Sequence, residues 1–406
     1  MAFRMDSGPL AGVRVVELAG WSGAFAGRLL ADAGADVIRV VSASGDPLDI
    51  EPPFFNDTAV SIQATWYNAG KRIVTFEEGA EGFSGLLADA DVFIEEPGRR
   101  RSLGTSLDHL VHVKISPFGE DGPWRAYRTN DLVANALSGA ASVTGDATTP
   151  PLTGYGNQSH HCVGLYAAVC ALAGLRYANQ TGRGVTIDLA AHEALASCTE
   201  QVLMQWFFPR AGNWGTPKAE RLGSLHWSRA YEVYAGKTGR GVMVTASLRP
   251  LDVLLPWLAE SGSEDDLADT EKYPNVVALI RDLPHVMDVL KRWVAKNDAD
   301  ELFFEAQRRH QPFGVVWDIA TAANTPQLEA RKYLQPVSVP GAGDQLLPGR
   351  LFRTDVDRQH PRPPKRVSMA DAGWTPRPER QATDEFPASL PKCSTIRLVI
   401  QQPVDL

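Results

Sequence analysis

Two adjacent histidines, His160 and His161, are the side chains in this sequence best placed for chemistry. They end a polar segment rich in glycine and amide groups, GYGNQSHHCVGLY (154–166). An apolar helix is predicted to follow, and a helix start offers free N–H groups and a positive dipole end that can stabilise an anion. Paired histidines at a helix start also serve as capping or surface residues, so the pattern alone leaves both roles open.

The elements around this segment alternate between strand and helix. A β-branched strand at 13–18, a helix at 24–34 and a strand at 35–41 predict a βαβ unit with parallel strands. Further strands are predicted at 72–77, 91–96, 112–116 and 185–190. The fold class is therefore α/β, with a doubly wound, Rossmann-like large domain that binds ligands at the carboxyl ends of its strands.

The rest of the chain divides by composition. Segments 131–146 and 164–178 are rich in Ala and Gly and predict closely packed helices, and a long helix is expected over 191–208. A stretch rich in Gly, Pro and Trp follows, and then YEVYAG and GVMVTA predict a hairpin around KTGR. We predict a large domain over 1–210, a smaller α+β domain over 225–335, an extended return to the large domain over 336–380 and a tail over 381–406.

The composition of the chain limits the classes of molecule that it is expected to bind. The net charge of −8 argues against nucleic acid and membrane surfaces but not against a small anion. The N-terminus lacks a signal sequence, and no stretch was expected to reach the roughly 18 apolar residues of a membrane span, so a cytoplasmic protein is predicted. The four cysteines have neither CxxC nor zinc-site spacing, so no metal is predicted.

Common cofactor motifs do not occur in the sequence. There is no GxxxxGK[ST], no GxSxG and no correctly placed GxGxxG. The glycine-rich segment GWSGAFAG (20–27) nevertheless follows a predicted strand and opens a helix. Backbone N–H groups at a helix start can hold a phosphate or a pantetheine arm without a strict motif.

An ordered series of motifs resembles one family, the family III coenzyme A transferases, also called the CaiB/BaiF family, which includes the α-methylacyl-CoA racemases. The matching segments are PLAGVRVVELAG, FAGRLLADAGADVIRVV with SGDPL, YNAGKRIVTFE, DVFIEEPGRRRSLG, VKISPFGEDGPWR, NDLVANALSGAASVTGD, GLYAAVCALAGLRYANQTGRGVTIDL, TPQLEARKYLQPV and LPGRLFR. They span about residues 9–355. The resemblance implies a large domain built from both ends of the chain, an inserted smaller domain, and two subunits threaded as interlocked rings.

The resemblance also implies coenzyme A, as acyl-CoA, and carboxylic acids as substrates. Phosphates of CoA suit Arg forks and Lys point charges. The CoA-binding residues that it implies are Ala19, Ser22, Gly23, Ala24, Arg39, Asn68, Lys71, Arg72, Arg101 and Arg128.

The implied catalytic position departs from the family pattern. Counting back from Gly164, the family's nucleophilic aspartate falls on His160, and 147–163 contains neither Asp nor Glu. An imidazole cannot form the mixed anhydride on which the family's exchange depends. The racemase pattern also differs, because Asn130 stands before Asp131 where those enzymes carry a histidine.

Three interpretations remain open. The chain is a transferase subunit that works with an Asp-bearing paralogue, as in two-subunit benzylsuccinate-type transferases, or with a homodimer mate. Alternatively, His160 or His161 is the base of an acyl-CoA racemase or isomerase, or the chain is a non-enzymatic binding protein for CoA thioesters. Aromatic side chains in three loops could line a site for a bulky or aromatic acyl group, although core packing explains most of them equally well. They are Trp124, Tyr155, Trp206, Trp214, His226 and Trp227.

Overall fold

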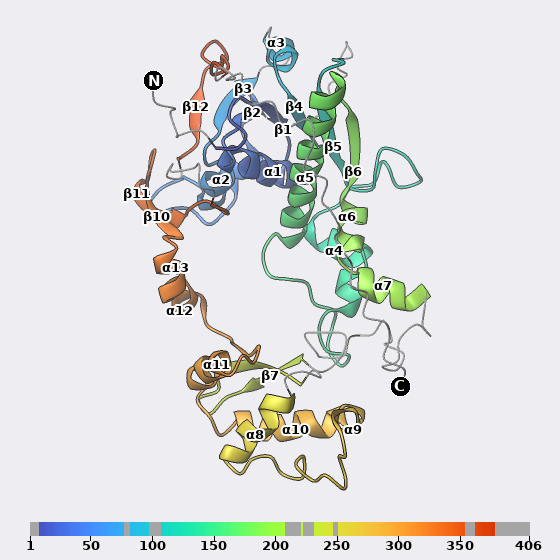
Figure 1. Cartoon of the computed structure of the whole chain (residues 1–406). Helices are drawn as coiled ribbons and strands as arrows, with labels where there is room; N and C mark the ends of the chain where they lie inside the picture. Colours follow the sequence, from blue (N-terminus) through green and yellow to red (C-terminus); the bar gives the residue numbers. More distant parts are fainter. Residues whose placement is uncertain are drawn as a thin grey trace, which may run out of the picture.

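The computed structural model describes residues 8–76, 82–96, 107–207, 221, 231–246, 251–353 and 362–377. Within these residues, the large domain contains a seven-stranded sheet in the order β12-β3-β2-β1-β4-β5-β6, with every neighbouring pair parallel (Figure 1). The strands are β1 (Arg14–Leu18), β2 (Asp36–Ser42), β3 (Arg72–Phe76), β4 (Val92–Glu95), β5 (Val111–Ser116), β6 (Thr186–Ala190) and β12 (Lys365–Val367). The predicted α/β class with a central parallel sheet is confirmed.

Alternating side chains of β1 direct the packing of both sheet faces. Val15 packs among residues of α1 (Trp21–Asp32) and α5 (Gln158–Thr181), whereas Val16 packs with α3 (Phe83–Ala88) on the opposite face. Strands β1 and β4 are adjacent in the sheet, and the chain adds strands in opposite directions on the two sides of this pair. Ligands of doubly wound sheets bind at such a reversal, beside the carboxyl ends of the strands.

Six further helices of the large domain lie among the described residues. They are η1 (Pro47–Ile50), α2 (Ile62–Tyr67), α4 (Asp131–Leu137), η2 (Ala140–Val143), α6 (Ala191–Ser197) and α7 (Glu200–Phe207). The prediction of one long helix over 191–208 is wrong. The N–H groups of Cys198 and Thr199 bond to carbonyls three residues earlier rather than four, and this tighter turn separates α6 from α7.

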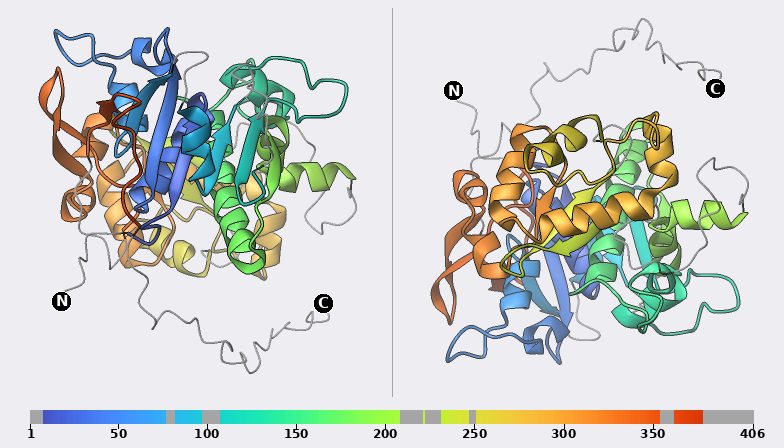
Figure 2. Two further views of the ribbon diagram at one scale, coloured as in Figure 1. Left: turned by 90° about the horizontal axis from the view of Figure 1, so that it is seen from above. Right: turned by 90° about the horizontal axis from the view of Figure 1, so that it is seen from below.

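The smaller domain lies apart from the sheet in Figure 1, and it overlaps the sheet in the views from above and below in Figure 2. Its predicted hairpin is confirmed as β7 (Tyr231–Ala235) antiparallel to β8 (Gly241–Thr245), and β9 (Gly314–Val315) pairs with β8. Trp257 and Trp293 pack edge to face at 4.7 Å in the core of this domain. Its helices are α8 (Leu251–Glu260), α9 (Val276–Arg281), α10 (Leu283–Val294) and α11 (Ala299–Arg308).

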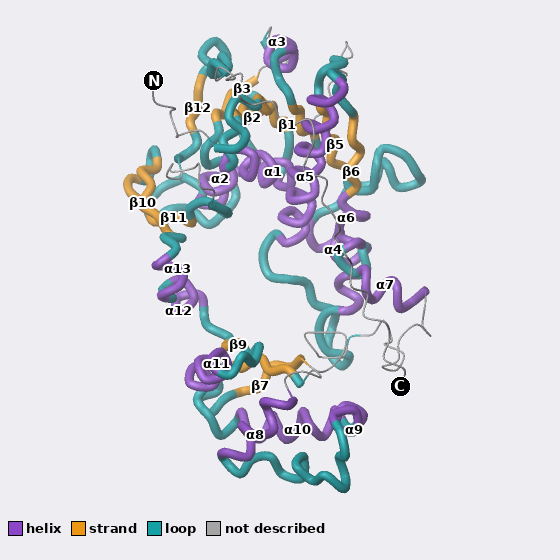
Figure 3. Tube along the Cα trace, viewed as in Figure 1, coloured by secondary structure: helices purple, strands orange, loops and turns teal. Residues whose placement is uncertain are grey.

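The chain then leads back through α12 (Ile319–Ala323) and α13 (Pro326–Ala330). Instead of one extended strand, the return contains an antiparallel hairpin of β10 (Leu334–Val339) and β11 (Gly343–Pro348), followed by the short strand β12 beside β3 (Figure 3). The dense prolines disfavour a long continuous strand because each one removes a backbone donor. The predicted tail over 381–406 lies outside the described residues.

Helix α5 corrects one expectation about membrane spans. This helix, Gln158–Thr181, is long and apolar enough to cross a membrane by length and composition. A core helix of a soluble protein passes the same test, and α5 packs against α1 and β5. The apolar composition of α5 is therefore weak evidence for a membrane span. Its packing against α1 and β5 also requires an apolar helix face.

Candidate active site

Helices α1 and α5 contact each other near their N-termini, at Gly164 in the second turn of α5. A Cβ atom at this position would lie 2.7 Å from the carbonyl oxygen of Ser22 and 2.9 Å from Cβ of Phe25, so glycine permits backbone contact between the helices. One turn earlier on α5, Nδ1 of His160 lies 3.0 Å from Oγ of Ser22. Two helix N-termini therefore converge on a serine–histidine pair.

His161 turns into an aromatic group rather than toward Ser22. Its Nε2 lies 2.6 Å from the Tyr67 hydroxyl, and its ring centroid is 4.6 Å from that of Phe25. Burial raises the pKa of Tyr67 to about 12, so this phenol stays neutral. The contacts fix the orientation of His161 and stabilise the junction between α2 and α5.

Asp131 lies at the first turns of both α4 and α5. Its Oδ1 accepts the Ser159 N–H at 2.8 Å, and its Oδ2 accepts a bond from the Asn135 amide at 3.4 Å. Asn130, which stands where racemases carry a histidine, is the N-cap of α4 and accepts the Val133 N–H at 2.9 Å. A negative charge at helix starts is stabilising, so Asp131 has a structural role here.

Burial determines the protonation of the two histidines. It lowers the pKa of both His160 and His161 from the ordinary value of 6.5, and the nearby Asp131 carboxylate only partly opposes this effect. Both imidazoles are therefore neutral at physiological pH. A neutral imidazole can accept a proton, which is the state that a base requires.

This protonation predicts an acid-sensitive contribution to stability. Because the folded protein binds the His160 proton less readily than the unfolded chain, stability falls as the pH drops through 6.5. Replacing His160 with Gln should reduce the loss of unfolding free energy between pH 7.5 and 5.5 by about 1 kcal/mol. Urea unfolding midpoints at the two pH values measure this effect. The control is His109→Gln, because His109 is exposed; equal pH dependence in both variants would contradict the prediction.

A carboxylate that sequence reasoning missed occupies the start of α1. Glu96 follows β4, and its two oxygens accept the N–H groups of Gly20 at 2.8 Å and Gly23 at 2.7 Å. A Cβ at Gly20 would lie 2.4 Å from a Glu96 oxygen, so a larger residue here would require the Glu96 carboxylate to move. Burial raises the pKa of Glu96, while the two backbone donors lower it. The sequence signal that could have indicated Glu96 is the acidic pair in DVFIEEPG, at the end of a predicted strand.

The predicted CoA-binding loop is therefore partly occupied by the chain itself. Ala19, Ser22, Gly23 and Ala24 are all buried at the start of α1. The N–H group of Gly23, which could hold a phosphate, donates to Glu96 instead. Contact of this loop with CoA stays a prediction.

Arg39 and Lys71 belong to a buried charge network around Glu17. Arg39 donates to Glu17 and forms a bidentate pair with Asp46 at 2.7 and 2.9 Å. Nζ of Lys71 donates to Glu17 at 2.8 Å, and Asn68 adds a weaker contact at 3.4 Å. All five side chains are buried, so phosphate contacts of Arg39, Asn68 and Lys71 remain predictions, and their observed role is to join β1, β2 and α1.

Of the other three cations predicted to bind CoA, two lie among the described residues. One guanidinium nitrogen of Arg72 donates to both carboxylate oxygens of Asp36, at 2.7 and 2.8 Å, and the other terminal nitrogen donates to the Gly373 carbonyl. Arg128 is exposed and free to approach a ligand in the loop after β5. Arg101 lies outside the described residues.

A pocket of about 310 Å³ opens at the carboxyl ends of β4 and β5. Its wall includes Glu96, Ser116 and two cations, Lys114 and Arg125. Of the predicted acyl-site aromatics, Trp124 lies in the adjoining loop and stacks on Tyr127, whereas Tyr155 and Trp206 are exposed. Trp214, His226 and Trp227 lie outside the described residues.

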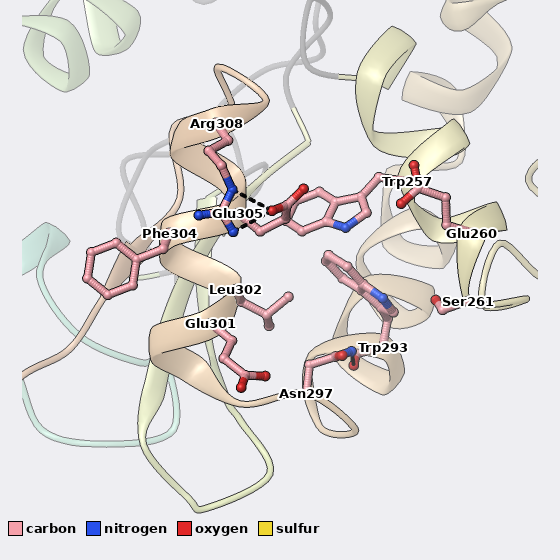
Figure 4. A pocket seen from close by; sticks show the side chains of 10 residues that line it. All are labelled: Trp257, Glu260, Ser261, Trp293, Asn297, Glu301, Leu302, Phe304, Glu305 and Arg308. Carbon is pink, nitrogen blue, oxygen red and sulfur yellow. Dashed lines mark hydrogen bonds and ion pairs between the residues drawn. The ribbon is translucent and has the colours of Figure 1, made fainter.

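A larger pocket, of about 700 Å³, lies in the smaller domain (Figure 4). Its floor is formed by Trp257 and Trp293, which are core residues. Glu305 pairs with Arg308 at 2.6 Å, and Glu260 pairs with Arg309 at 2.7 Å, so two of its carboxylates are neutralised. None of the residues predicted for chemistry lines it. Among the described residues, no cluster of three or more His, Cys, Asp or Glu could hold a metal ion.

A doubly wound α/β domain with a candidate site near the switch point of its sheet is typical of proteins that bind ligands there, and sequence comparison identifies the family. The chain belongs to CoA-transferase family III, whose model matches residues 10–366. It is 30% identical over 343 residues to the succinyl-CoA:(R)-benzylsuccinate CoA-transferase subunit BbsE of Thauera aromatica, covering 79% of this chain and 82% of that protein.

Two further similarities agree with this family. The chain is 27% identical to the succinyl-CoA–L-malate CoA-transferase beta subunit of Chloroflexus aurantiacus, covering 84% of this chain and 86% of the relative. The crystal structure of a CaiB/BaiF family protein from Brucella suis superposes with a TM-score of 0.71 at 24% identity, covering 89% and 97% of the two chains. The family membership shows a transferase that acts on CoA thioesters.

Proposed function

We propose that this chain is the subunit of a heteromeric family III CoA-transferase that lacks the nucleophilic aspartate and works in the cytoplasm beside an Asp-bearing paralogue. The observation that carries the proposal is the neutral His160 at the junction of α1 and α5, where the family pattern places the aspartate. Succinyl-CoA is the proposed CoA donor, because it is named in several relatives.

The chemistry of the residue at this position supports a partner. A carboxylate attacks a thioester to form a mixed anhydride, and the released CoA thiolate then forms an enzyme-bound thioester. An imidazole would give an acyl-imidazole, which hydrolyses readily and has no carbonyl carbon of the enzyme that the CoA thiolate could attack to form the enzyme-bound thioester. Asp131 does not substitute, because it is bound to the first turns of α4 and α5.

The surface of the large domain also supports a partner. Helices α4, α5 and α6 pack together, and α7 follows α6 in the chain (Figure 1). Three of these helices carry large apolar side chains that are more than a third exposed, which is unusual for a monomer. They are Leu132, Val133 and Leu137 of α4, Leu165, Tyr166, Val169 and Leu172 of α5, and Leu203, Met204, Trp206 and Phe207 of α7.

The names of relatives point to a two-subunit assembly. BbsE is named as a subunit, and the malate transferase of Chloroflexus aurantiacus has an alpha and a beta subunit that both resemble this chain. We propose that the apolar helices contact such a paralogous subunit within the interlocked arrangement implied by the family. A homodimer of this chain is the alternative that the same surface allows.

The test compares the chain alone with the assembled pair. Transfer of CoA from succinyl-CoA to benzylsuccinate, malate and glutarate is followed by liquid chromatography for the purified chain, for an Asp-bearing paralogue encoded beside it, and for the co-expressed pair. We expect the pair to exceed the sum of the two chains by at least about a hundredfold, the scale of a covalent-catalysis group.

Two controls make the result specific. Replacing the partner's aspartate with alanine should abolish transfer by the pair, whereas transfer by this chain alone at the rate of the pair would refute the proposal. Exchange of an acyl-CoA α-proton with deuterium by this chain alone would favour a racemase or isomerase. A binding protein would be favoured if CoA thioesters bind but neither the chain alone nor the co-expressed pair shows transfer, α-proton exchange or hydrolysis.

A further inference from the structure

The hydroxyl of Ser22 and the imidazole of His160 have the relation of a nucleophile to its base. Their Oγ and Nδ1 atoms are 3.0 Å apart, although the residues are 138 positions apart in the sequence. A serine hydroxyl is a weak nucleophile until an adjacent base accepts its proton, and a hydrogen bond of this length permits that transfer.

We propose that Ser22 and His160 form a nucleophile–base pair with which this chain hydrolyses acyl-CoA thioesters without a partner subunit. The proposal takes its substrate class, acyl-CoA, from the proposed function, but it adds a reaction that transfer between carboxylic acids does not include. The acceptor is water instead of a second carboxylic acid.

The protonation and orientation of His160 favour this chemistry. Burial lowers the pKa of His160, so the imidazole is available as a base at neutral pH. The Trp21 ring lies 6.3 Å from the His160 ring at an interplanar angle of 28°, which restricts the orientation of the imidazole. The first turns of α1 and α5 both lie beside the pair, but Glu96 and Asp131 accept the N–H groups of Gly20, Gly23 and Ser159 there, so these donors are not available to an oxyanion.

Glu96 links the segment that carries Ser22 to a nearby pocket. This residue lines the pocket at the carboxyl ends of β4 and β5, and its carboxylate also binds the N–H groups of Gly20 and Gly23 on either side of Ser22. Glu96 therefore lies between the pocket and the segment that carries Ser22, while Ser22 and His160 themselves do not line the pocket. Lys114 in the pocket wall is paired with Glu120 at 2.9 Å, so Arg125 is the lining cation that can meet an anionic group of the thioester.

The reaction balances in two steps with water as the only co-reactant. In the first step, Oγ of Ser22 attacks the thioester carbon, Nδ1 of His160 takes the hydroxyl proton, and the C–S bond breaks. The proton passes to the sulfur, so free CoA thiol leaves and an acyl ester remains on Ser22. In the second step, His160 takes a proton from water, the hydroxide attacks the ester carbon, and the carboxylic acid leaves as Ser22 regains its proton.

The test measures hydrolysis by the full-length chain in the absence of any acceptor carboxylate. Release of CoA thiol from acetyl-CoA, succinyl-CoA and benzoyl-CoA is followed with a thiol reagent and compared with the uncatalysed rate. We expect hydrolysis above that rate for at least one of the three, reduced at least a hundredfold in Ser22→Ala and in His160→Gln. Ser44→Ala, which alters an exposed serine, should retain the wild-type rate.

A covalent readout separates a nucleophile from a structural residue. Rapid acid quenching followed by mass spectrometry should find the acyl group on Ser22 in the wild-type chain, and no adduct in Ser22→Ala. Circular dichroism and the urea midpoint of Ser22→Ala show whether the variant is folded. No hydrolysis above the uncatalysed rate, full hydrolysis by Ser22→Ala, or an acyl group on another residue would each overturn the proposal. These results do not depend on transfer by the assembled pair, so each proposal can fail without the other.

Discussion

Replacing Glu17 with glutamine is expected to lower the free energy of unfolding by about 3–5 kcal/mol, the usual cost of breaking a buried ion pair. Glu17 is fully buried between the Arg39 guanidinium and the Lys71 ammonium. Burial lowers the pKa of Lys71 to about 8, and Glu17 opposes this effect. Without the carboxylate, Lys71 must either stay charged in the protein interior or lose its proton. Urea unfolding followed by circular dichroism measures the change.

The control for this variant is the same change of carboxylate to amide on the surface. Asp265 pairs with Arg292 at 2.7 Å, but both side chains are about half exposed. Asp265→Asn should therefore change the free energy of unfolding by less than about 1 kcal/mol. A double variant, Glu17→Gln with Lys71→Met, should recover part of the stability, because no unpaired ammonium remains. Equal effects of Glu17→Gln and Asp265→Asn would contradict the structural role of the network.

The same network explains why the sequence suggested a phosphate site there. Arg39 ends a predicted strand and Lys71 follows a turn, and both are positions where a cation could meet a ligand. Their partners Glu17 and Asp46 are 22 and 7 residues away from Arg39, and only the parallel pairing of β1 with β2 brings Glu17 beside it. A charge and its partner cannot be matched from spacing when a sheet joins them.

The sheet itself was predictable because local patterns determine it. Short β-branched runs separated by helices require parallel strands, and six of the strands agree with their predicted ranges to within one or two residues. Strand β12 and the hairpin of β10 and β11 were less predictable. Their pairing depends on distant segments, and proline obscures their periodicity.

The candidate site was predictable only in part. The helix start near His160 follows from the polar segment before an apolar run, and α5 begins at Gln158, two residues before that histidine. The sequence predicts Ser22 as part of a CoA-binding loop, but it does not predict the hydrogen bond of Ser22 to His160 or any role for Glu96. Both contacts join segments that are distant in the sequence through the packing of α1 against α5 and of β1 against β4.

Adding a single methyl group at Gly164 is expected to separate Ser22 from His160. In Gly164→Ala, the new Cβ would lie 2.7 Å from the Ser22 carbonyl oxygen and 2.9 Å from Phe25, and backbone atoms cannot rotate away as a flexible side chain does. The helices must move apart, which we expect to cost about 3 kcal/mol, the upper end for overpacking. A displacement on the order of 1 Å would also reduce hydrolysis by about a hundredfold. Urea midpoints and thiol release measure the two effects.

Gly85→Ala provides the matched comparison. Gly85 also lies inside a helix, α3, but no atom lies within 4 Å of the position of an added Cβ. There alanine should be neutral or stabilise the protein by about 0.5–1 kcal/mol, because it favours the helical backbone. If close contact of α1 with α5 positions the site, alanine should therefore lower the free energy of unfolding at Gly164 and leave it unchanged or raise it at Gly85. A stable Gly164→Ala that keeps its hydrolysis would show that Ser22 and His160 do not depend on that contact.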